Sequence, residues 1–470
     1  MGELFTHLHR HHLEKKAKSV VSLNERPMTS DKLDRLKKIL YDTNKKLLTC
    51  VLNCDERGMV GQPLLAWHSE RLVEATLQPE DVLAQAMHQT FGNIPVVNLF
   101  GDVLQLGAVK QTDLHHPPTD DNAIKNAGYT IYSTIKNVIV LDEIMRQKPA
   151  QQALRSRLNN IRCGKITQED CLQIRNRLIS KLSVDEQANF KGDKAIWLCE
   201  RWEDVNLRNY SILKTFSAVA QIRSEGRGRH HHKEDRMGQI PIKCTVATGC
   251  RVMLTKNQGP LTSLGLNNGA VGTVRSILYQ EGMGPNSFPE VIFVDFPGYT
   301  GPAFHPDHPK CVPIPPVETR CESDCCTRNG FPLMAAYAIT ISKSQGMTIG
   351  PGQQCTHAVI NLRISHDMES RAPGLTYTAF SRVSEDTDWC LAQDIPNERL
   401  MYINQHPQMK YRLKEEDRLN KLSETTFDNK RCTSNEYKLL IQQIDAYCDD
   451  EITDAICTKN NCTCIYHTNE

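Results

Sequence analysis

Short apolar runs alternate with amphipathic segments along most of the chain. Buried strands are predicted at residues 94–100, 137–141, 195–199 and 357–362. Helical spacing of apolar residues predicts helices at residues 30–47 and 79–90, and Thr167 with Asp170 forms a capping-box pattern at the start of another. Strands that alternate with helices indicate parallel sheets, so the pattern predicts an α/β fold.

The pattern of apolar and polar residues changes in the middle of the chain. Residues 223–238 lack a hydrophobic period, which predicts an exposed loop. From about Ile242 onward, short β-type runs are separated by glycine turns, and Asn268-Gly269 is a strong hairpin signal. We expect a small β-barrel here, inserted before the next apolar run.

That next run, Met334 to Ile341, has the length of a strand buried on both faces. It is followed by Ser342-Lys343-Ser344-Gln345-Gly346 and then Thr348. A buried strand that ends in hydroxyls, a lysine and a glycine is typical of a phosphate-facing turn. An ordinary serine-capped helix fits the same letters, so the local pattern leaves both interpretations open.

Two other segments carry polar groups at the ends of predicted elements. The strand at 94–100 is followed by Gly101-Asp102 and then Gln105, which suits the carboxyl edge of an α/β sheet and equally an Asx turn. In the segment 374–383, helical spacing puts Tyr377, Phe380 and Val383 on one face and leaves Arg382 outside it.

Composition narrows the range of functions. The chain has 470 residues, with 56 basic and 55 acidic side chains, so nucleic-acid binding would need a local groove and not bulk charge. It has no apolar run long enough to span a membrane, and its N-terminus lacks the apolar core of a secretory signal. We therefore expect a nuclear or other intracellular, non-secreted protein whose 18 cysteines are thiols.

Neither the histidines nor the cysteines predict a metal site. The histidines at positions 7, 9, 11 and 12 suit a solvated tail better than a ligand set. Cys321, Cys325 and Cys326 form an irregular cluster without a partner Cys-x-x-Cys, which falls short of a zinc pattern. The cysteines beyond residue 426 lie in a tail to which the sequence assigns no role.

A set of motifs in a fixed order identifies a family. The chain contains GDVLQL, LDEIMRQ, GCRVMLTKN, LNNGAVGTV, PLMAAYAITISKSQGMT and YTAFSRV, in that order. They resemble, motif for motif, the PIF-type DNA helicases of superfamily one, especially the RecD-related branch carried by Helitron transposons. The resemblance runs from about residue 92 to about residue 425.

The resemblance implies a RecA-like P-loop NTPase architecture with a partial first lobe, a complete second lobe and a small SH3-like β-barrel insert. The implied divisions are a polar N-terminal segment (1–60), the partial first lobe (61–142), the second lobe (143–241 and 331–425), the insert (242–330) and a cysteine-containing tail (426–470).

The resemblance also implies roles for individual residues. ATP and Mg²⁺ would bind between the lobes, and single-stranded DNA would cross both. The implied catalytic residues are Gln105, Arg146 and Arg382, and the implied nucleotide sensors are Gly101, Asp102, Gln345 and Gly346. The implied DNA contacts are Thr340, Lys343, Ser344 and Thr348. Arginine suits the catalytic role because its planar fork meets phosphate oxygens bidentately.

The chain departs from the family upstream of Gly101. No G-x-x-x-x-G-K-[ST] loop occurs there, and Gly58 and Gly61 are followed by Gln-Pro and cannot replace it. The acidic pair for Mg²⁺ is expected near residues 72–75, where valine stands in the aspartate position and Glu74 is the remnant. Without these groups, most nucleotide affinity should be lost.

Two readings follow. In the first, the chain is a truncated or degenerate ATP-dependent helicase, or an incomplete gene model of an active one. In the second, it is a non-catalytic single-stranded-DNA-binding or interaction module derived from such a helicase. We expect no DNA-stimulated ATPase from the isolated chain, and weak, salt-sensitive binding to single-stranded DNA. The implied partners are single-stranded DNA and a missing N-terminal helicase lobe or other replication or recombination proteins, with no membrane.

Overall fold

A computed structural model describes most of the chain between residues 51 and 429. The described ranges are 51–76, 90–94, 96–108, 111–191, 194–228, 237–257, 259–284, 287–321 and 325–429, with positions 34, 36, 37 and 40 of an N-terminal helix. The predicted helix at 79–90, the histidine-rich start and the cysteine-containing tail after residue 429 fall outside these ranges, apart from Thr90. None of the described helices is long and apolar enough to cross a membrane.

The chain divides into two compact units. One contains Met1–Thr134 and Asp142–Glu415, and the other contains Ile135–Leu141 and Glu416–Glu470. The predicted strand at 137–141 is wrong, because this stretch is irregular, with Ile139 70% and Leu141 87% exposed. Among the described residues, no strand pairs with this stretch. An apolar sequence alone does not reveal whether such a partner exists.

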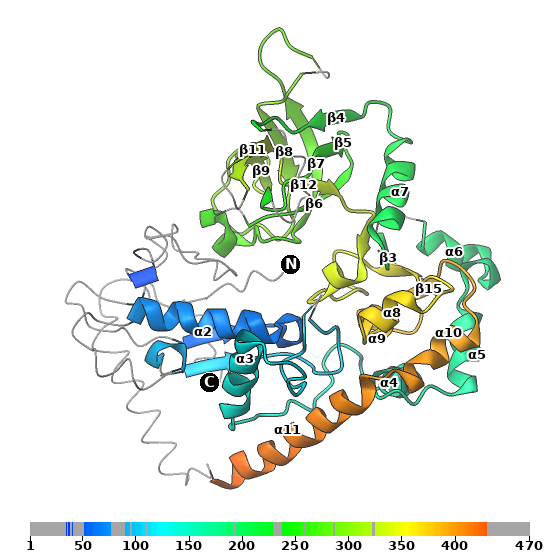
Figure 1. The fold of residues 1–470 in the computed structure, drawn as a ribbon. Coiled ribbons are helices and arrows are strands. Elements are labelled where there is room, and N and C mark those ends of the chain that lie inside the picture. The colour runs from blue at the N-terminus through cyan, green and yellow to red at the C-terminus, as the bar shows by residue number, and fades with distance from the viewer. Residues whose placement is uncertain are drawn as a thin grey trace, which may run out of the picture. The chain divides into compact units, whose positions relative to one another are not determined.

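In the first unit, a two-stranded parallel sheet joins β1 (Val51–Cys54) to β2 (Val96–Leu99). β2 confirms the strand predicted at 94–100. Helices α2 (Gln62–Thr76) and α3 (Ala123–Thr134) pack against each other beside it (Figure 1). Since the two strands are parallel, both lead to the same sheet edge, where polar residues follow each of them.

A second parallel sheet has the order β13-β3-β14-β15. Its strands are Ala338–Thr340, Ala195–Cys199, His357–Asn361 and Trp389–Leu391. Ile196, Leu198 and Val359 are fully buried, as expected for strands covered on both faces. β3 and β14 confirm two of the predicted strands.

The helices of the first unit after α3 are mostly short. They are α4 (Gln152–Arg162), α5 (Gln168–Asn176), α6 (Val184–Asn189), α7 (Trp202–Leu213), α8 (Asp367–Arg371), α9 (Leu375–Phe380), α10 (Asn397–Met401) and α11 (Met409–Asn429), which continues into the second unit. The capping box predicted at Thr167 and Asp170 is confirmed at the start of α5.

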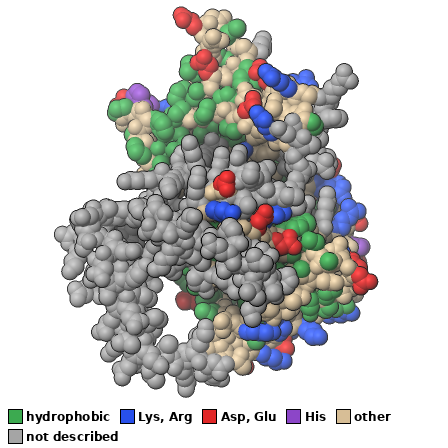
Figure 2. Space-filling view, turned by 60° about the vertical axis from the view of Figure 1, so that its left-hand side comes forward, with side chains coloured by type: hydrophobic (Ala, Val, Ile, Leu, Met, Phe, Trp, Pro, Cys, Tyr) green, Lys and Arg blue, Asp and Glu red, His purple; other side chains and the backbone are tan. Residues whose placement is uncertain are grey.

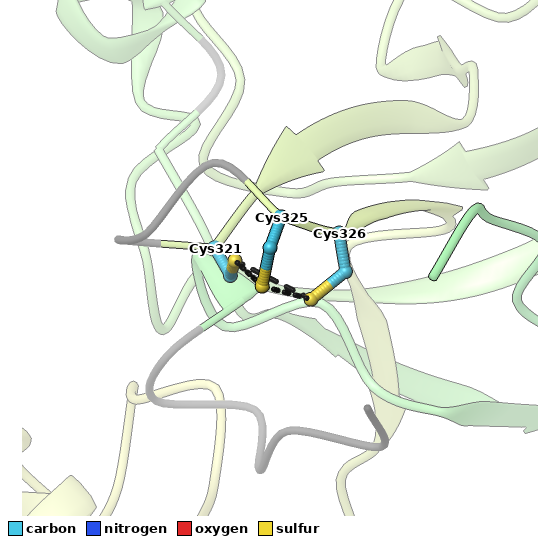
Figure 3. Close-up of side chains that lie close together, drawn as sticks. All are labelled: Cys321, Cys325 and Cys326. Atoms are coloured by element: carbon cyan, nitrogen blue, oxygen red, sulfur yellow. Dashed lines mark hydrogen bonds between the residues drawn. The ribbon is translucent and has the colours of Figure 1, made fainter. Parts of the chain in front are cut away.

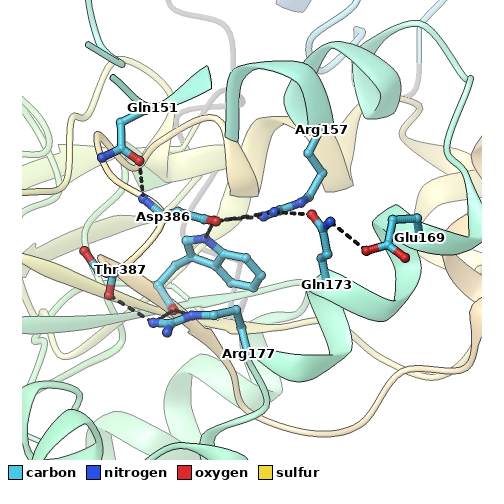
Figure 4. Close-up of polar contacts among 8 residues, drawn as sticks. Gln151, Arg157, Glu169, Gln173, Arg177, Asp386 and Thr387 are labelled. Atoms are coloured by element: carbon cyan, nitrogen blue, oxygen red, sulfur yellow. Dashed lines mark hydrogen bonds and ion pairs between the residues drawn. The ribbon is translucent and has the colours of Figure 1, made fainter. Parts of the chain in front are cut away.

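A polar network ties α4 and α5 to the strand β15 (Figure 4). Arg157 on α4 donates to Asp386 at 2.8 Å and to Gln173 at 2.6 Å. The indole Nε1 of Trp389 donates to the same Asp386 carboxylate at 3.0 Å. Arg177 donates to the Trp389 carbonyl at 2.8 Å. These contacts bind the helical cover to the sheet through charge-assisted hydrogen bonds.

The middle of the chain is rich in β-strands, as expected, while the closure of these strands into a barrel stays a prediction. Its antiparallel sheet has the order β12-β6-β7-β8-β9, with strands Leu333–Ala335, Arg251–Leu254, Val271–Leu278, Val291–Asp295 and Cys311–Ile314. Two strand pairs accompany it, β4 (Ala220–Arg223) with β5 (Lys243–Val246) and β10 (Val317–Arg320) with β11 (Thr327–Gly330). Gly269 has φ 98°, as a turn after Asn268 requires.

The apolar run from 334 to 341 is not one strand. β12 pairs with β6 of the insert, whereas β13 pairs with β3 of the second parallel sheet. Asn209 on α7 holds the break, because its amide donates to the carbonyls of Ala335 and Ala338 and accepts from the N–H groups of Tyr337 and Ala338. A run of apolar letters reports burial but cannot report a change of sheet.

Candidate functional site

An acidic pair, Asp55-Glu56, directly follows the strand β1. The Phe100 N–H donates to the Cys54 carbonyl at 2.7 Å, and the Arg57 N–H donates to the Phe100 carbonyl at 2.7 Å. These bonds extend the β1–β2 pairing past the strands and hold the pair beside Gly101. Glu56 has φ 50°, a left-handed conformation that is uncommon outside glycine.

The place expected for the acidic pair is wrong. Residues 72–75 lie inside α2, and Glu74 forms an ion pair with Arg71 on the same helix at 3.0 Å. Among the described residues, two carboxylates instead follow β1, which lies earlier in the chain. The sequence did contain a signal for this pair, namely a short apolar segment followed by Asp-Glu. It has the same pattern as the apolar segment followed by Gly101-Asp102. The prediction assumed a fixed spacing between the acidic pair and GDVLQL, and this spacing pointed to residues 72–75 instead.

Asp102 anchors the first sheet to α4. Arg162 donates to both of its carboxylate oxygens, at 3.1 and 2.8 Å, and the Leu104 N–H donates to it at 2.9 Å, which is the Asx turn considered above. Burial opposes ionisation, but the bonds from Arg162 outweigh it, so the pKa of Asp102 is lowered. Gly101 beside it has φ 138° and is exposed.

Gln105 lies in a segment that packs into the largest hydrophobic core. Val103, Leu104 and Leu106 are buried there together with residues of the second parallel sheet. Arg412 donates from Nε to the Val103 carbonyl at 3.0 Å and from Nη2 to the Gln105 carbonyl. The backbone of Gln105 is therefore fixed, while its side chain is half-buried.

Two arginines predicted to act on phosphate lie near one another. Arg146 donates to the Thr348 hydroxyl at 3.1 Å and to the Ser381 carbonyl at 2.9 Å. Arg382 is 1% exposed and donates to the Thr378 carbonyl and the Ser381 hydroxyl. Burial, and then the charge of Arg146, lower the pKa of Arg382 to about 10, while Glu56 opposes that shift. Two guanidinium groups that repel each other would be stabilised by an anion between them.

The turn after β13 is a single 3₁₀ turn, η8 (Ile341–Ser344). Thr340 caps it, since its hydroxyl accepts from the Lys343 N–H at 3.4 Å, so the cap is a threonine and the element is not an α-helix. Ser344 is fully buried and donates to the Ile341 carbonyl at 2.7 Å. Gly346 has φ 76°. The hydroxyls of Thr340 and Ser344 thus shape the turn.

Gln345 connects this turn to the first sheet. Its Nε2 lies 3.5 Å from Oε2 of Glu56, across 289 positions of sequence. Burial, and then Asp55, raise the pKa of Glu56, whereas Arg382 and Arg146 act to lower it. Glu56, Arg146, Gln345 and Arg382 therefore form one polar cluster between residues that follow β1 and residues that follow β13.

An open groove of about 420 Å³ lies next to the same turn. Its lining includes Lys343, the exposed aromatic rings of Trp202 and Tyr210 on α7, and Lys243 on β5. The Lys343 ammonium lies 5.5 Å from the centroid of the Trp202 ring, a cation–π distance. On the face drawn in Figure 2, basic side chains are interspersed with acidic ones over the described residues. The groove thus has the local combination of lysine and aromatic groups that single-stranded nucleic acid prefers.

Comparison with known proteins gives one sequence relative and a set of similar folds. No protein-family model matches the chain. It is 27% identical over 305 residues to the ATP-dependent DNA helicase PIF7 of Trypanosoma brucei brucei. The match covers 55% of this chain and 29% of PIF7, so the chain spans less than a third of that relative's length.

Solved structures with a similar fold include Pif1 helicases. The Candida albicans enzyme superposes with a TM-score of 0.57 at 21% identity, covering 86% of this chain and 80% of that one. The Bacteroides enzyme in complex with ADP-AlF₃ and single-stranded DNA gives 0.52 at 19% identity, covering 80% and 76%. The α/β, RecA-like fold is confirmed by these matches. The SH3-like character of the insert and the proposed residue roles stay predictions.

Proposed function

We propose that this chain, a homologue of the Pif1-type ATP-dependent DNA helicases, grips single-stranded DNA and senses the γ-phosphate of ATP in a DNA motor. The observation that supports this most is the polar cluster of Glu56, Arg146, Gln345 and Arg382. Its members come from distant parts of the sequence, and Gln345 lies 3.5 Å from Glu56. Phosphoryl transfer requires such positioned charge and little covalent chemistry from the protein.

The cluster would couple nucleotide to DNA. Arg146 donates to the hydroxyl of Thr348, which is an expected DNA contact, and to the backbone beside Arg382. If a γ-phosphate bound these guanidinium groups, Arg146 would donate to phosphate in place of the Thr348 hydroxyl. The turn that carries Lys343 would then respond to the nucleotide. Gln105, fixed through its backbone, would complete the phosphate-facing side.

Asp55 and Glu56 are the residues that would hold Mg²⁺. Carboxylate oxygens are the ligands this hard cation prefers, and Asp55 is exposed at the end of β1. A cation would relieve the mutual repulsion that helps to raise the pKa of Glu56. When bound, Mg²⁺ supplies positive charge to the phosphate oxygens. No G-x-x-x-x-G-K-[ST] loop for the inner phosphates occurs in the 470 residues.

The ATPase assay tests whether the cluster can support ATP hydrolysis without a phosphate loop. We expect the purified 470-residue chain to show no DNA-stimulated ATP hydrolysis, because the amides and lysine of a phosphate loop supply most of the nucleotide affinity. Turnover that Arg382→Ala abolishes would contradict this expectation and would show that the cluster works without such a loop. In other systems, an arginine in this role raises the rate of phosphoryl transfer by about 10³- to 10⁵-fold.

The second candidate function is a non-catalytic module that binds single-stranded DNA. The lack of a phosphate-loop motif in the 470 residues favours it. The coding sequence upstream of residue 1 discriminates between the two. An in-frame G-x-x-x-x-G-K-[ST] supports the motor, and the chain extended by that segment should then hydrolyse ATP in an Arg382-dependent way. A stop codon with no such motif supports the module.

A further inference from the structure

Three cysteines meet at the end of a hairpin in the insert (Figure 3). β10 and β11 are antiparallel, and Arg320 lies opposite Thr327. Cys321 and Cys326 extend this register by one pair, because the Cys321 N–H donates to the Cys326 carbonyl at 3.0 Å. Directly opposed residues place their side chains on the same face of a sheet. The third thiol, on Cys325, comes from the neighbouring position.

The three sulfur atoms form a nearly equilateral triangle. Cys321 Sγ lies 3.5 Å from Cys325 Sγ and 3.3 Å from Cys326 Sγ, and the last two are 3.4 Å apart. Zinc–sulfur bonds of about 2.3 Å in a tetrahedron place sulfur atoms about 3.8 Å apart. An ion could therefore be held after movements of a few tenths of an ångström. A disulfide would join only two of the three thiols.

We propose that Cys321, Cys325 and Cys326 are three thiolate ligands of a structural Zn²⁺ ion. All three ligand atoms lie within 4.8 Å of one another. Soft thiolates in a reducing compartment select zinc over magnesium or calcium. Zinc in thiolate sites is four-coordinate, so water or a further side chain completes the set.

The surroundings are built closely around the cluster. Cys321 is 5% and Cys326 4% exposed, and both pack against the buried Met237. A Cβ on Gly228 would come within 2.7 Å of the Cys326 Cβ, so the backbone there lies directly against the thiols. Cys325 is exposed and leaves a route for the ion from solvent. Ligands held close together and a path by which the ion can enter are features that a metal site requires.

A zinc ion at this site would stabilise the end of a three-stranded arrangement formed by β10, β11 and the segment before β5. β11 also exchanges hydrogen bonds with the preceding segment, since Glu225 and Asn329 each donate to the other's carbonyl at 2.8 and 2.6 Å. The Thr327 N–H donates to the Arg227 carbonyl at 3.0 Å. Zinc at Cys321 and Cys326 would cross-link β10 to β11 where this arrangement ends. The spacing of the cysteines could not reveal the site, because the hairpin, not the sequence, brings Cys321 to Cys326.

The experiment measures metal in the full chain, purified under reducing conditions without a histidine tag. We expect about one zinc ion per chain by mass spectrometry, and thiolate-to-metal absorption when cobalt replaces it. Cys325→Ser should lose both signals and keep the far-UV circular dichroism of the wild type, because Cys325 is exposed. Cys163→Ser is the matched control, since Cys163 is a half-buried thiol outside the cluster. It should keep both signals.

Three results would overturn the proposal. The wild type could lack zinc and give no cobalt–thiolate absorption. Zinc could persist in Cys325→Ser without thiolate absorption, which would mean an adventitious ion only, bound to histidines such as those at positions 7–12 or 230–232. Peptide mapping of the reduced protein could instead find a disulfide between Cys321 and Cys326.

Discussion

The two parallel sheets of the first unit differ in how well they are covered. In the second sheet, Ile196, Val359 and Cys390 are fully buried. In the first sheet, Val96 is 42% exposed and Phe100, directly after β2, is 49% exposed. Parallel strands are stable when both faces are covered. Both sheets contribute to a hydrophobic core, but the core of the first is smaller and leaves part of β2 exposed.

The roles that we propose divide between the same two sheets. The turn with Lys343, for which we propose a DNA contact, follows β13 of the well-covered sheet, and the carboxylates of Asp55 and Glu56 follow β1 of the less covered one. Arg57, next to them, donates to the Tyr132 hydroxyl at 2.5 Å, and Tyr132 donates to Glu415 at 2.5 Å. We therefore expect the second sheet to be the more rigid of the two and the strand ends of the first to open more readily.

The largest effect is expected from Arg399→Ala in the second lobe. Arg399 lies 2.9 Å from Glu200 and 3.8 Å from Glu369, and all three side chains are essentially inaccessible to solvent. Removing the cation leaves two buried carboxylates uncompensated, which costs about 3–5 kcal/mol. Hydrogen exchange of β3 and β14 should accelerate strongly. Arg175→Ala is the control, since its pair with Asp394 is exposed and worth about 0–1 kcal/mol.

A smaller effect is expected from Tyr132→Phe in the first lobe. The change removes one hydroxyl, shared by Arg57 and Glu415, and should cost about 1.5–3 kcal/mol in total. Exchange in β1 and α2 should accelerate while β3 and β14 keep their protection. Tyr129→Phe, on the same helix α3, is the matched control. Equal acceleration in both sheets would refute the idea that the two are covered independently.

The smallest effect is a pH response confined to the second lobe. Burial raises the pKa of Asp388 to about 6, against hydrogen bonds from Glu385 and Ser384 that lower it. A raised carboxyl pKa favours the folded state below the unfolded value and loses that contribution as pH rises through the folded value. Between about pH 4 and 6, the wild type should lose on the order of 1–3 kcal/mol relative to Asp388→Asn. Denaturation of both proteins at about pH 4 and about pH 6 measures this. The same difference in unfolding free energy between the two proteins at both pH values would contradict the prediction.

Sequence reasoning succeeded where the signal was local. The strands β3 and β14 and the capping box of Thr167 are each determined by neighbours in the chain. It failed where a distant partner decides the outcome. The stretch at 137–141 is apolar but unpaired among the described residues, and the run 334–341 divides between two sheets because Asn209 satisfies the break.

The site shows the same limit. The motifs that carry Gln105, Arg146 and Arg382 could be placed by their order along the chain. Asp55-Glu56 was missed because the spacing to Gly101 is longer than the one assumed, and the pairing of β1 with β2 places it beside Gly101. The contact between Gln345 and Glu56 spans both sheets, so no local pattern contains it.

The affinity of the chain for a fluorescently labelled single strand, measured by anisotropy over a range of salt concentrations, tests the central claim most directly. We expect binding that weakens steeply as salt rises, because counterions are released from phosphates. Lys343→Ala should bind more weakly and lower the salt slope by about 0.7, while Lys125→Ala should match the wild type. Binding that does not depend on salt, or no binding at low salt, would contradict the assignment of a DNA grip to this chain.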